Sequence, residues 1–139
     1  MSYDIKQVIL YRKDLNMRKG KIASQVAHAS MKVLLDRSHI SENENGHFVM
    51  NTFLHDEHVK EWLVSKFAKI VLEVMTENDL ILAYEEAIKR GLPASLITDA
   101  GLTEFQGVPT KTCVAIGPTK SDEIDKITGK HGIILTKLA

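Results

Sequence analysis

The chain has 139 residues, of which 44% are hydrophobic and 26% are charged, and its 18 basic and 18 acidic side chains give a formal net charge of zero. This length and composition predict one soluble globular domain over residues 1–139. The single cysteine excludes an intrachain disulfide framework and a multi-cysteine zinc site, and no apolar run is long enough to span a membrane. We therefore expect a cytoplasmic protein without a membrane partner.

The first part of the chain predicts a strand, a helix and a long loop. The β-branched and apolar run at 7–12 (QVILYR) has the length and composition of a strand. Residues 20–35 have a helical period, because apolar side chains recur from Ile22 to Val33 at i, i+4, i+7 and i+11. Residues 36–56 are polar and show little periodicity, so we expect a loop excursion there.

The rest of the chain alternates between helices and strands. In order, we expect a helix at 57–67, a strand at 68–74, a helix from Thr76 to Gly91, strands at 94–101 and 111–118, a helix at 121–129 and a short final strand. This alternation predicts an α/β fold. The first three strands are joined through helices, which favours parallel crossovers, whereas the short link between the strands at 94–101 and 111–118 favours a hairpin. The central sheet is therefore expected to be mixed and mostly parallel.

Basic side chains gather between the first strand and the first helix. Residues 12–21 carry five basic side chains and one acid, a local charge of +4. Free N–H groups and the positive dipole end make a helix N-terminus an anion site, and Lys19 and Lys21 add full charges there. A nucleotide-binding P-loop is not indicated, because Leu15 and Ile22 occupy positions that need Gly and Ser or Thr. A solvated charged loop explains the same cluster equally well.

One face of the first helix is polar. The side chains at i, i+4, i+7 and i+11 along it are Lys21, Gln25, His28 and Lys32. Such a face could bind an anion or take part in catalysis. Spacing alone favours an ordinary solvated helix face.

A second candidate site lies at the end of the predicted strand 94–101. Asp99 is followed by Ala and Gly, and ligands of α/β proteins bind beyond the carboxyl ends of the strands. The carboxylate could orient or deprotonate a water, and Thr103 could add a hydroxyl; an Asx-turn explains the aspartate equally well. His55 and His58 have a spacing of i, i+3 but no apparent third ligand, so we expect no metal site.

The order of these motifs resembles the archaeal- and eukaryotic-type peptidyl-tRNA hydrolases, the second of two unrelated hydrolase types. The segments that carry the resemblance are DLNMRKGKIASQVAHA after the first strand, then LITDAGLTEF, VAIGP and DEIDKITG. Together they span nearly the whole chain, from about Gln7 to Leu138. The combination is specific, although each segment alone would be weak.

The resemblance implies a three-layer α/β/α domain with about four main strands. It implies metal-independent and cofactor-free hydrolysis of the ester between a peptide and the 3′-terminal ribose of tRNA, often by homodimers. By position, the family's site residues are Lys21, Gln25, His28, Asp99 and Thr103. For the reaction itself, our hypothesis is that Asp99 acts on water, Lys21 stabilises developing negative charge, Thr103 donates a hydrogen bond and His28 either shuttles a proton or holds its neighbours.

Binding of tRNA is expected to involve Arg18, Lys19 and Lys32, with Gln25 beside them. The chain departs from the family at Leu102, where a basic residue is common, and at Glu104, where glutamine is common. These departures leave open two alternatives: a catalytically silent module that binds tRNA or a protein, and a different small hydrolase or nucleotide-binding regulator.

Overall fold

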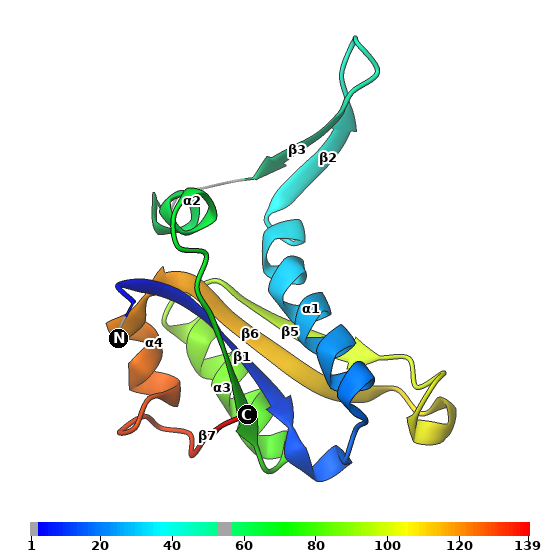
Figure 1. The fold of residues 1–139 in the computed structure, drawn as a ribbon, viewed down its shortest axis with the longest axis vertical. Coiled ribbons are helices and arrows are strands. Elements are labelled where there is room, and N and C mark those ends of the chain that lie inside the picture. The colour runs from blue at the N-terminus through cyan, green and yellow to red at the C-terminus, as the bar shows by residue number, and fades with distance from the viewer. Residues whose placement is uncertain (1–2, 53–56) are drawn as a thin grey trace.

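The computed structural model describes residues 3–52 and 57–139 (Figure 1). The strands are β1 (Ile5–Arg12), β2 (Ser38–Glu42), β3 (Phe48–Thr52), β4 (Lys69–Val74), β5 (Ala94–Asp99), β6 (Thr110–Lys120) and β7 (Lys137–Leu138). The helices are α1 (Lys19–Leu35), α2 (Glu57–Val64), α3 (Glu77–Lys89) and α4 (Ser121–Thr128), with single 3-10 turns at Lys13–Leu15 and Phe105–Gly107. The predicted α/β class is confirmed.

The central sheet has five strands in the order β5-β6-β1-β4-β7. Among the described residues only β1 and β4 pair in parallel, while the three other neighbouring pairs are antiparallel. The sheet is mixed as predicted, but the expectation that it is mostly parallel is wrong. β1, β4 and β5 do point in the same direction, as helical crossovers require. However, β6 lies between β1 and β5 and is antiparallel to both. The sequence pattern indicates the direction of successive strands, but it does not indicate which strands are neighbours in the sheet.

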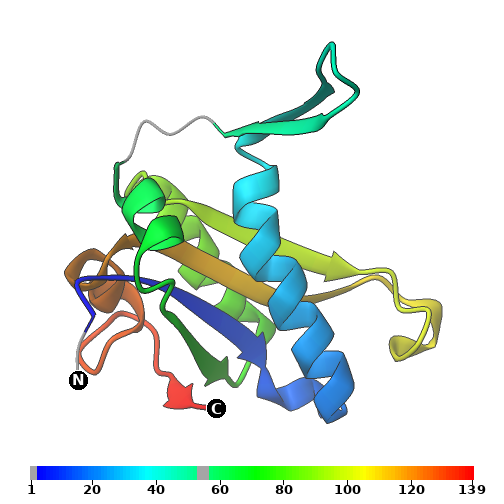
Figure 2. The ribbon, with the colours of Figure 1, turned by 45° about the horizontal axis from the view of Figure 1, so that its top comes forward.

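Helices cover both faces of this sheet, which confirms the predicted three layers. Alternate residues of a strand point to opposite faces, so Val8 and Leu10 of β1 pack with α3 and α4 while Ile9 and Tyr11 pack with α1. The helix α2 lies beside α1 and buries Trp62, whose Nε1 donates a 2.8 Å hydrogen bond to the Ala68 carbonyl. The N-terminal end of α1 lies at the end of the sheet where β1 and β5 finish (Figure 2).

Residues 38–52 form a hairpin, not the loop excursion that the sequence predicts for 36–56. The strands β2 and β3 pair in antiparallel register, and the Asn43 side chain closes the turn by accepting hydrogen bonds from the N–H groups of Asn45 and His47. Each strand is only five residues long and largely exposed, so neither shows a clear alternation, although Asn45-Gly46 is a dipeptide typical of hairpin turns. We call residues 38–52 the hairpin arm, because both ribbon views show it extending beyond α1, away from the sheet (Figures 1 and 2).

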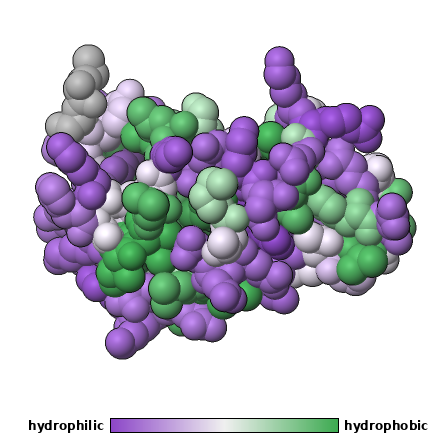
Figure 3. Space-filling view, turned by 90° about the horizontal axis from the view of Figure 1, so that it is seen from below, coloured by the Kyte–Doolittle hydropathy of each residue, from purple (hydrophilic) through white to green (hydrophobic). Residues whose placement is uncertain are grey.

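The face of the molecule drawn in Figure 3 is mostly hydrophilic with separate apolar patches. Figure 3 shows one face on which hydrophilic side chains surround several hydrophobic areas. Leu102, in the turn after β5, is 88% exposed. In the described parts of the chain, no helix has both the length and the apolar character needed to cross a membrane.

Candidate active site

The first turn of α1 faces the end of β5. Lys21 lies in that turn and Asp99 is the last residue of the strand. The Lys21 Nζ donates hydrogen bonds to Asp99 Oδ1 at 2.9 Å and to Thr103 Oγ1 at 2.8 Å. Three of the residues predicted for catalysis are therefore in direct contact, on segments about 80 residues apart.

A second side chain of α1 also donates a hydrogen bond to the Asp99 carboxylate. Gln25 is only 1% exposed, and its Nε2 donates a 3.2 Å hydrogen bond to Asp99 Oδ1. Its Oε1 accepts a 2.5 Å hydrogen bond from the hydroxyl of Thr112, which is fully buried in β6. The sequence reasoning missed Thr112. The available signal was a hydroxyl residue at the start of the otherwise apolar run from Cys113 to Ile116.

The turn after β5 also holds Asp99 in place. The backbone N–H of Gly101 donates a 2.9 Å hydrogen bond to Asp99 Oδ2, which is an Asx-turn contact. Gly101 has φ +80, and a Cβ there would lie 2.5 Å from the Val108 carbonyl oxygen. A glycine is thus required for the chain to fold back at this point. The Asx-turn and the candidate site are both present, so they are not alternatives.

These contacts set the charge state of the carboxyl group. The hydrogen bond from Lys21 is the main reason that the pKa of Asp99 is lowered, and Gly101 and Gln25 act in the same direction against the opposing effect of burial. Asp99 is therefore ionised at neutral pH. A carboxylate with a lowered pKa is a weak general base, so the geometry favours orienting a water over taking its proton outright.

A shallow hollow opens above the ion pair. It is lined by Arg18, Gly20, Lys21, Ser24, Thr103 and Glu104. Across it, Arg18 Nε donates a 2.9 Å hydrogen bond to Glu104 Oε1, with the Arg18 side chain 79% exposed. The hollow thus brings the Arg18–Glu104 ion pair beside two of the catalytic candidates, Lys21 and Thr103. Sequence reasoning noted Glu104 as unusual but did not predict its pairing with Arg18.

Comparison with known proteins identifies the family of this chain. The model of the family described as "Peptidyl-tRNA hydrolase PTH2" matches residues 5–133. The chain belongs to this family. A peptidyl-tRNA hydrolase from Methanopyrus kandleri is 41% identical, and one from Sulfurisphaera tokodaii is 42% identical, each over 124 residues that cover 89% of this chain and 93% of the relative.

A solved structure supports the fold of this peptidyl-tRNA hydrolase family member. A protein of unknown function from Agrobacterium tumefaciens strain C58 superimposes with a TM-score of 0.56 over 99% of both chains at 12% identity. At that identity the likeness concerns the fold alone. The resemblance predicted from the sequence is thus confirmed by the family match and the sequence relatives.

In this member of the peptidyl-tRNA hydrolase family, the remaining candidates for the site lie away from the contacts among Lys21, Asp99 and Thr103. His28 is exposed on α1, about 10 Å along the helix from Lys21, and no hydrogen bond or ion pair joins the two within the described chain. Lys32 lies further on and pairs with Asp36 at 2.9 Å. Lys19 is exposed at the first position of α1, next to the hollow.

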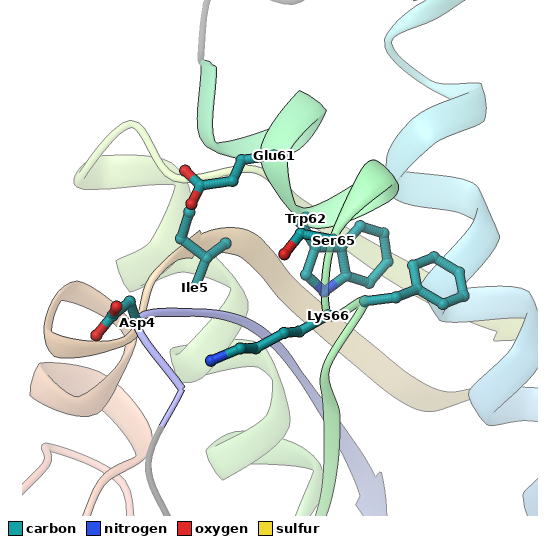
Figure 4. A pocket seen from close by; sticks show the side chains of 7 residues that line it. Asp4, Ile5, Glu61, Trp62, Ser65 and Lys66 are labelled. Carbon is teal, nitrogen blue, oxygen red and sulfur yellow. The ribbon is translucent and has the colours of Figure 1, made fainter.

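Other features of the chain lie apart from this site. A small hollow between α2 and the start of β1 is lined by Asp4, Glu61 and Lys66 (Figure 4), at the sheet end opposite Asp99.

Burial raises the pKa of Cys113 to about 12, so its thiol is not a nucleophile at neutral pH. Residues 3–52 and 57–139 contain no group of three His, Cys, Asp or Glu side chains that could hold a metal; His55 lies outside the described residues.

Proposed function

We propose that the chain hydrolyses the ester between a peptide, or an N-blocked aminoacyl group, and the 3′-terminal ribose of tRNA, which recycles tRNA in translation. The observation that carries the proposal is the contact of Lys21 with both Asp99 and Thr103 in a chain of this family. We further propose that residues 1–139 act as a single domain, in the cytoplasm and as a homodimer.

The reaction needs no covalent intermediate, because the ribose alkoxide that leaves an ester is a better leaving group than the amide anion that would leave a peptide bond. Water adds to the ester carbonyl carbon, and the tetrahedral intermediate then breaks its bond to the ribose 3′ oxygen. One proton of the water ends on that oxygen, and the other leaves the new carboxyl group for solvent. Asp99 orients the water through a carboxylate oxygen. Thr103 binds the water or the substrate beside it.

Lys21 stabilises the negative charge that develops on the carbonyl oxygen. An ammonium has three N–H donors, and within the described chain two of them bind Asp99 and Thr103. The third is available to the oxyanion. A donor in this role typically contributes about 3 kcal/mol of transition-state stabilisation. The exposed His28 then serves as a proton shuttle or a substrate contact.

The basic start of α1 binds the tRNA end. Arg18 and Lys19 are exposed beside the hollow and meet phosphates with full charges, while the free N–H groups of the helix start add to the attraction. Lys32 extends this basic surface along the same helix. Gln25 contributes by fixing Asp99 beneath the bound end.

The decisive experiment measures release of a defined N-blocked amino acid from its tRNA by purified protein. Lys21→Met and Asp99→Asn are expected to lower kcat about 100-fold to 1000-fold, with the fold checked by circular dichroism. Lys32→Met is the matched control, since Lys32 lies on the same helix away from Asp99, and it should change KM more than kcat. Full activity of both site variants would overturn the assignment. Salt-dependent tRNA binding by the unaltered chain without cleavage would instead identify a binding module.

A further inference from the structure

The hairpin arm carries an apolar face that its own chain leaves open. Ile40, Phe48 and Met50 are 46%, 74% and 39% exposed. Ile40 is paired with Met50, and Phe48 is two residues before Met50, so all three lie on one face of the two strands. A two-stranded hairpin is at best marginally stable alone. The arm therefore gains stability from any surface that covers this face.

A groove along α1 offers such a surface. It has a volume of 450 Å³ and is formed mainly by Ala23, Val26, Ala27, Met31, Trp62 and Phe67. Ala23 and Ala27 are small and exposed, so another backbone can approach the helix closely there. Met31 and Phe67 are 47% and 48% exposed. We call this hollow the α1 groove.

The arm and the groove match in length and in charge. Five residues of a strand span about 17 Å, and α1 from Ala23 to Leu34 rises about 17 Å. Glu42 lies on the same arm face as Phe48, because the two are paired across the hairpin. Lys69 lines the groove, where its ammonium lies over the Phe67 and Trp62 rings, and none of the ion pairs among the described residues includes it. An arm laid in the groove would bring opposite charges together.

The arm of one chain does not fill its own groove. The ribbon views show the arm continuing past the end of α1 (Figures 1 and 2). The groove, by contrast, is lined mainly by residues within α1 and by Trp62, Phe67 and Lys69. We propose that two copies exchange arms, each laying Ile40, Phe48 and Met50 into the α1 groove of the other. Such a contact is reciprocal, so it closes as a two-fold dimer. The inference gives an interface to the homodimer of the proposed function, and rests on it to that extent.

Light scattering coupled to size-exclusion chromatography tests the exchange. The unaltered chain should have twice the 15.6 kDa mass of one copy. Phe48→Ser with Met50→Ser on the arm, and Met31→Glu in the groove, should each raise the dimer dissociation constant about tenfold or more. The matched control is Met75→Glu, because Met75 is 50% exposed and outside the groove. Asn51→Ser, on the opposite arm face, is the control for the hairpin.

Mixing the two defective variants distinguishes arm exchange from packing of groove on groove. The arm variant keeps an intact groove and the groove variant keeps an intact arm, so their mixture should form a dimer with one complete contact. A monomeric unaltered chain, an arm variant that dimerises as tightly as the unaltered chain, or a mixture that stays monomeric would overturn the proposal. Cleavage of peptidyl-tRNA, measured alongside, reports separately on the proposed function, because none of these variants alters the Lys21–Asp99 pair.

Discussion

The ammonium of Lys21 lies 2.9 Å from the carboxylate of Asp99, although 78 residues separate the two along the chain. Their side chains are only 11% and 15% exposed. At this depth Lys21 is the principal partner of Asp99, so a change at Lys21 alters the pKa of the carboxyl group.

Substitution of Lys21 should therefore be visible in the titration of Asp99. In Lys21→Met the pKa of Asp99 should rise from its lowered value toward or above the ordinary 3.8, because the main cause of the lowering is gone. Carbon-13 NMR of the side-chain carboxyl measures this directly. A native Asp99 that titrates at or above 3.8 would contradict the ion pair.

The same pair makes stability depend on pH in a defined direction. A carboxyl group with a lower pKa in the folded state stabilises the fold above its unfolded pKa, and this contribution is lost as pH falls through the folded value. The difference in unfolding free energy between the unaltered chain and Lys21→Met should thus be constant near neutral pH and shrink below about pH 4. Urea denaturation at several pH values measures it.

The hydroxyl of Thr112 is expected to position Gln25. Thr112→Val keeps the shape but leaves the buried Gln25 Oε1 without its donor, which should cost about 1–3 kcal/mol of stability. It should also lower kcat at nearly unchanged KM, because Gln25 then holds Asp99 less firmly. Thr112→Ser should restore activity. Thr128→Val is the control, since its buried hydroxyl bonds only within α4; an equal loss of kcat there would show a general packing effect.

Glu104 is expected to weaken tRNA binding by occupying Arg18. Glu104→Gln should tighten binding and steepen the dependence of log K on log salt by about 0.7–0.9, the effect of one additional phosphate contact. Filter binding at salt concentrations between about 50 and 200 mM measures both the affinity and its dependence on salt. Glu123→Gln removes a comparable surface pair with Lys126 on α4 and should change neither.

Two glycines near the site should respond in opposite ways to alanine. Gly101→Ala should lower stability by about 2 kcal/mol and reduce activity, because φ is +80 and the new Cβ would meet the Val108 backbone. Gly20→Ala should raise stability by about 0.5 kcal/mol, because Gly20 is helical and has open space around it. Thermal unfolding of both variants measures the contrast. Destabilisation by both would mean that the conformation at Gly101 is not the cause.

Local patterns predict most helices and strands of this chain well. The helix start predicted at Thr76 is confirmed, because Thr76 caps α3 and its hydroxyl oxygen accepts a hydrogen bond from the Asp79 N–H. Such features depend on neighbouring residues alone. The hairpin arm was missed because its strands are short and largely exposed, so burial leaves little imprint on their sequence.

Long-range relationships were harder to predict. The resemblance brought Lys21, Asp99 and Thr103 into one site, and the structure puts them in contact. The role of Thr112 depends on β6 lying between β1 and β5, and no local pattern encodes that placement. The pairing of Arg18 with Glu104 likewise depends on how the turn after β5 returns toward α1.

The place of β6 also constrains when the site can form during synthesis. β5 has β6 as its only neighbour among the described strands, and Thr112 of β6 braces Gln25. Until residues 110–120 have left the ribosome, Asp99 sits on a strand with no partner. A nascent copy of this chain is itself a peptidyl-tRNA, and it gains a complete site only after β6 has been made. The order of translation thus delays assembly of the site until β6 can pair with β5.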